Sequence, residues 1–387
     1  MLRIFKRALA VFLVSLALSA CQIIPSGGQP EPSAPPPPQA EGPGDMPALP
    51  SDTDRHRIAL LVPLSGDNAE VGQSIANATT MALLDTNAQN LRITTYDTAR
   101  GAQDAADRAI AEGNRLILGP LLRDDVGDVL GRARNADVPL ISFSNDISVA
   151  RADAFVMGHV PEQSVRRTIA YASERGARNF AALAPNGEYG QRALDAVQEA
   201  LRRSGGTLVA VERYDRGNTS IISAAERLEA QGGYDAVLIA DGARLASMAA
   251  SALKEDGAAR PLILGPELWS GEDDVTRASA MRGAWFSAVS DNRYRQFVDS
   301  YEARFGTRPY RIATLGYDAV LLALRVARDW APGDEFPVAE LLDDGGFLGI
   351  DGPFRFRSTG VGERSMEVRE VGRGSVSVVS PAPTQFN

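Results

Sequence analysis

The residues with the clearest potential for covalent chemistry are Ser251 and Lys254, which have the Ser-x-x-Lys spacing of a serine nucleophile with a lysine base. That chemistry also requires a Lys-Thr-Gly element. The sequence contains only one other lysine, Lys6, and arginine follows it. The second element is therefore missing, and Lys254 is expected to be a solvated charge on a helix surface.

The two histidines, His56 and His159, are the only imidazoles that could serve as a general base or a zinc ligand. His56 stands at the end of a proline-rich segment, and His159 stands beside Pro161. Neither has other ligand residues at the spacing of a zinc site. A catalytic triad and a zinc centre are therefore both disfavoured.

Paired carboxylates and phosphate loops offer no better route to catalysis. Asp273-Asp274 and Asp343-Asp344 are adjacent in sequence, so the two carboxylates of a pair do not face each other on one side of a helix. No Gly-x-Gly-x-x-Gly pattern follows Gly119-Pro120. We expect a protein that is not an enzyme and that has no cofactor and no metal.

Cys21, the only cysteine in 387 residues, follows Leu18-Ser19-Ala20 at the end of an apolar run with basic residues ahead of it. The run has the length of a signal-peptide core and is too short to span a bilayer. The four residues resemble a bacterial lipobox. Residues 1–20 are therefore expected to be a lipoprotein signal peptide, with Cys21 as the lipidated residue that attaches the protein to a membrane. A single cysteine also excludes an internal disulfide.

Residues 21–56 are rich in proline, glycine and polar side chains and have no periodic apolar face. We expect a lipidated cysteine followed by a disordered tether, and about 30 residues of extended polyproline conformation would reach on the order of 100 Å. The net charge of −9 and the pI near 5.0 argue against nucleic acid as a partner.

After Arg57, short apolar runs alternate with amphipathic stretches. The expected strands are 58–62, 91–96, 116–118 and 139–142, then 179–184, 207–212, 236–240 and 261–264. The expected helices are 71–84, 102–111 and 126–133, then 162–175, 191–203, 223–229 and 244–255. This alternation predicts an α/β fold in which helices cover both faces of parallel sheets. Ligands of such sheets bind at the carboxyl ends of the strands.

Four stretches in order resemble the type I periplasmic binding proteins, and in particular the leucine-binding-protein-like group. They are IALLVPLSGDNAEVGQSIANATTMAL, LILGPLLRDDVGDVLGRARNADVPLISFSND, AALAPNGEYGQRALDAVQEAL, and ATLGYDAVLLAL followed by GIDGPFRFRSTG. The resemblance covers nearly everything from Arg57 to about Arg369. It implies two Rossmann-like lobes with parallel sheets flanked by helices, joined by three hinge crossovers.

The resemblance also sets the expected domain limits. Lobe 1 is expected from residues 57–157 plus 288–345, and lobe 2 from 158–287 plus 346–378. Residues 379–387 are expected to be a disordered tail. Small molecules usually bind between two such lobes.

Some of the family's ligand-contacting residues have counterparts in this sequence, and others are replaced. Tyr189 matches the family's tyrosine, and Glu267 matches the acidic residue that receives a ligand ammonium. The family usually places hydroxyls and backbone amides around the ligand carboxylate, whereas this chain has Arg123, Asp124, Asn145 and Asp146. Arg123 could bind a carboxylate with both arms of its guanidinium, but the two aspartates would repel one.

Ser65 completes the candidate set, although a serine at that position also serves the turn between a strand and a helix. The expected ligand is a small molecule that bears an amine or a carboxylate.

Two functions fit these features. The lipid anchor, the long tether and the altered amino-acid pocket are similar to those of the penicillin-binding protein activators, lipoproteins that stimulate a peptidoglycan synthase by protein contact. Gln22 after the cysteine is compatible with the inner leaflet of the outer membrane, facing the periplasm. The alternative is the substrate-binding lipoprotein of an ABC transporter for amino acids or related small solutes, with an ABC permease as partner.

Overall fold

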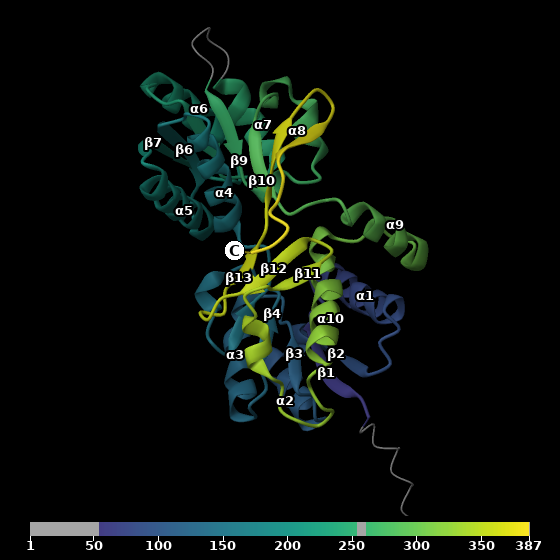
Figure 1. Cartoon of the computed structure of the whole chain (residues 1–387). Helices are drawn as coiled ribbons and strands as arrows, with labels where there is room; N and C mark the ends of the chain where they lie inside the picture. The colour runs from purple at the N-terminus through teal and green to yellow at the C-terminus, as the bar shows by residue number, and fades with distance from the viewer. Residues whose placement is uncertain (1–53, 254–260, 387) are drawn as a thin grey trace, which may run out of the picture. The chain divides into compact units, whose positions relative to one another are not determined.

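The computed structural model describes residues 54–253 and 261–386 (Figure 1). The predicted signal peptide, Cys21, nearly all of the predicted tether and Lys254 lie outside these residues. Within them, no helix combines the length and the apolar character that crossing a bilayer requires.

The first sheet is entirely parallel and has the strand order β2-β1-β3-β4-β5. Its strands are β1 (His56–Val62), β2 (Leu91–Asp97), β3 (Leu116–Leu118), β4 (Leu140–Ser142) and β5 (Ala154–Val156). The helices between them are α1 (Ala69–Asp85), α2 (Ala102–Ala111) and α3 (Arg123–Asn135). Ile58 to Val62 of β1 are fully buried. A central strand with helices on both faces needs apolar side chains on both faces, which explains the unbroken apolar run.

The second sheet has the order β15-β14-β10-β9-β8-β6-β7. The parallel strands are β6 (Asn179–Pro185), β7 (Thr207–Tyr214), β8 (Ala236–Ile239), β9 (Leu262–Gly265) and β10 (Trp285–Ala288). The antiparallel strands β14 (Glu367–Val371) and β15 (Val376–Ser380) extend one edge. The helices are α4 (Pro161–Glu174), α5 (Glu188–Ser204), α6 (Ser220–Gln231), α7 (Ala243–Ala252) and the short α8 (Asp273–Arg277). The two sheets confirm the predicted two-lobed α/β fold.

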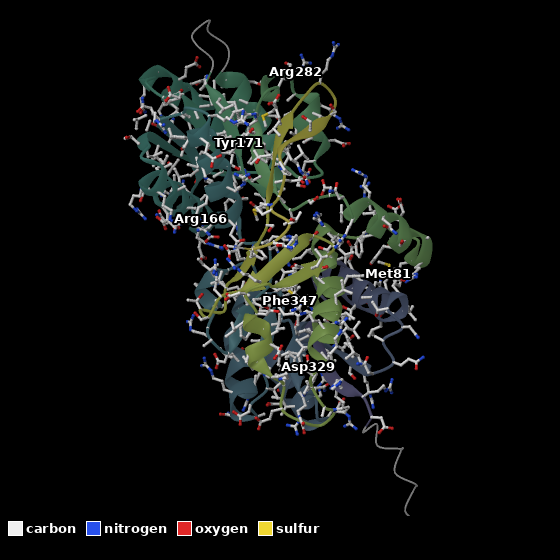
Figure 2. All side chains as sticks on the ribbon, in the orientation of Figure 1. Met81, Arg166, Tyr171, Arg282, Asp329 and Phe347 are labelled. Carbon is white, nitrogen blue, oxygen red and sulfur yellow. The ribbon has the colours of Figure 1, made fainter. Side chains whose placement is uncertain are left out.

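The chain returns to the first lobe through α9 (Tyr294–Phe305) and α10 (Thr314–Val326), and α10 packs along α1. A small antiparallel sheet follows, formed by β11 (Phe347–Gly349), β12 (Gly352–Phe356) and β13 (Gly362–Arg364). Its phenylalanines Phe347, Phe354 and Phe356 belong to the same core as β1 and α10 (Phe347 is labelled in Figure 2).

This packing moves the predicted lobe limit. The sequence placed the change of lobe at residue 346, but the apolar faces of β11 to β13 are buried on the first lobe. The chain therefore passes to the second sheet only after Arg364. The predicted tail also begins too early, because β15 continues to Ser380 and Arg167 donates a hydrogen bond of 2.5 Å to the Ser380 hydroxyl.

The chain passes between the two sheets three times: before α4, after β10 and after β13. Near these passages lies a group that we name the Asp351 cluster, formed by Asp351, His159, Arg311 and Thr314. The fully buried Asp351 carboxylate lies 2.8 Å from His159 Nε2, and it accepts hydrogen bonds from Arg311 at 2.5 Å and Thr314 Oγ1 at 2.7 Å. Burial alone would raise the pKa of Asp351, but Arg311 and His159 hold it below its usual range.

A second buried pair, Asp318 and Arg364, lies beside this cluster. Arg364 donates to the carbonyl of Met157 at 3.0 Å and lies 3.7 Å from the Asp318 carboxylate, which accepts from the Ile350 amide at 2.6 Å. A Cβ on Gly349 would meet that carboxylate at 2.3 Å, so only glycine permits the approach. Burial raises the pKa of Asp318 to about 7, and the charge of Asp351 adds to the rise. The passages between the lobes are thus held by buried charges.

Candidate ligand-binding site

Tyr189 lies in the first turn of α5, directly after β6. The turn is tight, because a Cβ on Gly190 would lie 1.9 Å from the carbonyl oxygen of Pro185. Gly72 has the same relation to Pro63 in the first lobe, at 1.7 Å. In each lobe, the absence of a side chain on one glycine lets the first turn of a helix pack directly against the end of the preceding strand.

The phenolic oxygen of Tyr189 is buried and has no hydrogen-bond partner among the described residues. The Arg216 guanidinium lies over its ring, 4.8 Å from the centroid. Burial raises the pKa of Tyr189, and the nearby charge of Glu267 adds to the rise. A buried hydroxyl without a partner costs free energy that a ligand acceptor or donor would recover.

Glu267 follows β9 in a short 3-10 turn, Glu267–Trp269. The Ser164 hydroxyl of α4 donates to its carboxylate, and the Glu267 amide donates to Ser164 Oγ at 3.2 Å. Trp269 fixes the turn, because its ring lies on Gly265, where a Cβ would approach within 2.3 Å, and its Nε1 donates to the Asp241 carbonyl at 2.8 Å. Burial raises the pKa of Glu267 to about 7.

Replacing Glu267 with glutamine is expected to weaken the dependence of stability on pH. The pKa of about 7 stands against an ordinary value of 4.5, so folding favours the protonated carboxyl. That contribution is complete at acidic pH and is lost as pH rises through 7. The thermal midpoint of the wild type should therefore fall between about pH 5 and pH 8, and that of Glu267→Gln should fall less. Thermal unfolding at constant ionic strength measures both, with the exposed Glu174→Gln as control. Equal slopes in wild type and Glu267→Gln would contradict the assignment.

Arg123 is engaged by carboxylates of the chain itself. Its Nε lies 2.9 Å from Asp146, which is 4% exposed, and its NH1 lies 3.0 Å from Glu188 of the second lobe. Asp146 also accepts from the Ser148 amide at 2.8 Å. Burial would raise the pKa of Asp146, but this hydrogen bond and the charges of Arg192 and Arg123 lower it. A ligand carboxylate would compete with these two anions for the Arg123 guanidinium.

A second bridge joins the lobes at Asn145. Arg192 of α5 donates to the Asn145 carbonyl at 2.7 Å and pairs with Glu162 at 2.7 and 3.0 Å. The Asn145 side chain takes no part in this contact. Together with the pair of Arg123 and Glu188, this bridge links the strand ends of the two lobes.

The remaining candidates lie apart from this arrangement. The hydroxyl of Ser65 donates to Asp97 at 2.8 Å, and Asp97 also accepts from the Leu64 amide, so Ser65 holds the turn between β1 and α1. Asp124 is exposed in the first turn of α3. In residues 54–253 and 261–386, no three His, Cys, Asp or Glu side chains are arranged to hold a metal ion.

The structure adds residues that the sequence did not single out. Asp241, 6% exposed, follows β8 and accepts from the Tyr214 hydroxyl at 2.7 Å and from Arg216 at 2.8 Å. It directly follows the strand that the sequence predicted at 236–240, and ligands of parallel sheets bind at such strand ends. Ser164 and Arg192 lie on helices, and nothing in their local sequence marks them.

Two parallel-sheet lobes joined by three chain passages, with polar side chains at the strand ends of both, define a binding protein of the periplasmic type. The profile of the family described as Periplasmic binding protein matches residues 56–375, and the chain belongs to that family.

The chain is similar to proteins of two described kinds. A penicillin-binding protein activator LpoA from Glaesserella parasuis is 28% identical over 153 residues, which is 39% of this chain and 26% of that protein. The crystal structure of full-length LpoA from Haemophilus influenzae superposes with a TM-score of 0.66 at 20% identity, covering 85% of this chain and 59% of that one. The leucine binding protein LivK from Thermotoga maritima gives 0.61 at 20% identity, covering 86% and 98%.

The match spans 46% or less of the length of the first curated relatives. The structural likenesses, at these identities, establish the fold.

Proposed function

We propose that this chain is a lipoprotein of the cell envelope that stimulates a peptidoglycan synthase, a penicillin-binding protein, by protein–protein contact. It is anchored through Cys21 to the inner leaflet of the outer membrane and does not catalyse a reaction itself. The sequence relatives described as penicillin-binding protein activators support this proposal.

The observation that carries the proposal is the engagement of Arg123. The guanidinium that would receive the carboxylate of a free amino acid is already paired with Asp146 and Glu188. Displacing Asp146 would remove the 2.9 Å ion pair of a carboxylate with 4% exposure, which is costly. Asp146 and Glu188 thus take the place that a ligand carboxylate would have beside Arg123. A protein that does not bind a free amino acid there would act on its partner through its outer surface.

A second function, capture of a small solute for an ABC permease, is favoured by the other half of the site. The Tyr189 hydroxyl has no partner in the described part of the chain, and Glu267 lies near it with its pKa raised to about 7. An ammonium group entering there would favour the ionised form of Glu267, and it could also donate a hydrogen bond to the phenolic oxygen of Tyr189. The ligand class would be a small amine.

One variant separates the two functions. With full-length protein in detergent and a peptidoglycan synthase from the same organism, we expect the rate of glycan-strand synthesis to rise equally with wild type and with Tyr189→Phe/Glu267→Gln. The double variant keeps the fold because both replacements are nearly isosteric. Rates of lipid-linked precursor consumption measure the effect.

The same proteins are then heated with leucine, isoleucine and muropeptides. A ligand at about a hundred times its Kd adds about 2.7 kcal/mol to the free energy of unfolding. The activator proposal predicts no such shift with free amino acids. A shift that disappears in the double variant, together with no effect on the synthase, would establish solute capture instead.

A further inference from the structure

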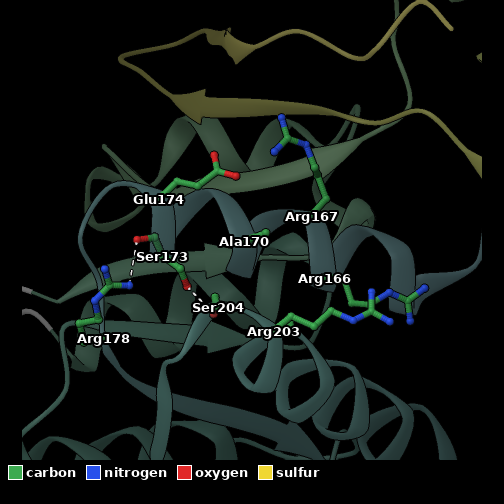
Figure 3. Close-up of a pocket in the computed structure, with 9 residues that line it drawn as sticks. Arg166, Arg167, Ala170, Ser173, Glu174, Arg178, Arg203 and Ser204 are labelled. Carbon is green, nitrogen blue, oxygen red and sulfur yellow. Dashed lines mark hydrogen bonds between the residues drawn. The ribbon is translucent and has the colours of Figure 1, made fainter. Parts of the chain in front are cut away.

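A cavity of about 560 Å³ lies on the second lobe between α4 and α5 (Figure 3). Its lining is dominated by guanidinium groups, although the chain as a whole carries a net charge of −9. The arginines are Arg166, Arg167, Arg178 and Arg203, and Glu174 is the acidic residue that the described part of the chain contributes to the lining.

The positive charge of this arginine pocket is only partly neutralised. Arg166 and Arg203 share one carboxylate, that of Glu199, at 3.1 and 2.5 Å. The guanidinium hydrogen bonds of Arg178 and Arg167 go to neutral oxygens: Arg178 donates to the Ser173 carbonyl at 3.3 Å, and Arg167 to the Ser380 hydroxyl. The backbone amide of Arg178 donates to the Asp235 carboxylate at 2.8 Å. Within the described residues, four guanidinium groups thus lie near three carboxylates, those of Glu174, Glu199 and Asp235.

The pocket is partly prearranged for an anion. The carbonyl and hydroxyl bonds hold Arg178 and Arg167 in place, which lowers the side-chain entropy lost on binding. At the base, the Ser173 hydroxyl donates to the Ser204 hydroxyl at 3.1 Å, so the Ser204 hydrogen is available as a donor. Ser173 is 4% exposed, which places this pair below the arginines.

The spacing of the arginines decides what kind of anion fits. Figure 3 shows Arg178 at one end of the pocket, Arg166 and Arg203 at the other, and Arg167 on a third side. Guanidinium groups on different sides of the pocket are matched better by several anionic groups than by one small anion. An extended chain with several carboxylates supplies them, and each carboxylate matches the fork of a guanidinium.

We infer that the arginine pocket binds an acidic, carboxylate-rich segment of a partner protein. The inference does not depend on which partner the proposed function names, because the pocket lies on the outer face of α4 and α5, away from Tyr189 and Glu267. The negative charge of the rest of the chain directs such a segment to this position by repelling it elsewhere.

The test uses a fluorescently labelled octaglutamate peptide and full-length protein in detergent, with fluorescence anisotropy at low and physiological salt. The wild type should bind, and more weakly at higher salt. Arg178→Gln/Arg203→Gln should raise the Kd by about tenfold or more, because one charge-assisted contact is lost at each end. Arg202→Gln/Arg244→Gln removes the same net charge from exposed arginines outside the pocket and should change the Kd by less than about twofold.

Three further measurements decide the inference. Arg178→Lys/Arg203→Lys keeps the charge but loses the fork, and should bind between wild type and the glutamine variant. An octaglutamine peptide should not bind, and inorganic phosphate should not displace octaglutamate. Equal weakening in both glutamine pairs, displacement by phosphate, or no binding by the wild type would each overturn the inference. Unchanged thermal midpoints show that the exposed substitutions leave the fold intact.

Discussion

Replacing Asp351 with alanine is expected to lower the free energy of unfolding by about 3–5 kcal/mol, the usual cost of removing one partner of a buried ion pair. The carboxylate is fully buried and is the shared acceptor for Arg311 and Thr314, with His159 at 2.8 Å. Among the described residues, its loss leaves Arg311 with the longer ion pair to Asp291, at 3.5 Å, and with the ring of Tyr294, whose centroid lies 3.9 Å from the guanidinium carbon. Urea denaturation followed by circular dichroism measures the change.

The matched control is Asp124→Ala, which removes the same charge from an exposed position. It should change stability by less than about 0.5 kcal/mol. The pKa of Asp351 is held below its usual range, so its contribution is present at neutral pH and is lost as pH falls. The difference between Asp351→Ala and wild type should therefore shrink on acidification. A loss below about 1 kcal/mol at neutral pH would show that the Asp351 cluster does not stabilise the fold.

Replacing Cys21 with alanine is expected to abolish lipid attachment completely. The proposed lipidation needs the thiol, and cleavage is proposed to follow acylation. The wild type recovered from membranes should therefore start at Cys21 and carry acyl chains, whereas Cys21→Ala should keep residues 1–20 and carry none. Each buried methylene contributes about 0.8 kcal/mol to membrane binding, so two or more chains make the attachment durable.

Intact-protein mass spectrometry distinguishes these species directly. Ser15→Ala, a change within the apolar run, serves as the control and should be processed like the wild type. A wild-type mass equal to that of an unmodified chain would refute the anchor.

Strong local patterns made the fold predictable. The fully buried run Ile58 to Val62 marks a central parallel strand because both of its faces must be apolar. Helix starts were less accurate: α3 begins at Arg123 and α5 at Glu188, three residues before the predicted positions. In both helices the first turn lacks aliphatic side chains until its end, so the periodic aliphatic pattern begins about one turn later than the helix.

The lobe limit at residue 346 failed for a different reason. Alternating phenylalanines such as Phe354 and Phe356 predict a strand with one buried face, but not the core on which that face packs. Sequence spacing carries no information about that choice.

The positions of the candidate residues at strand ends were predictable, whereas the partners of these residues were not. Tyr189 and Glu267 follow β6 and β9 in the expected loops. The partners of Arg123 could not be foreseen, because Glu188 is 65 residues away along the chain. The contact between Arg123 and Glu188 depends on how the two lobes pack against each other. The residues near Arg123 in the sequence give no information about that packing.

The position of β1 has a mechanical consequence. The strand begins at His56, pairs with β2 through seven residues and with β3 through three, and lies between them. A force transmitted through the residues ahead of His56 would pull along the strand axis, so the hydrogen bonds of both ladders would bear the load together rather than break one after another. If the folded domain is attached to a membrane through the residues ahead of His56, such a force would shear β1 against β2 and β3. A strand resists this direction of pulling more than it resists being peeled from one end.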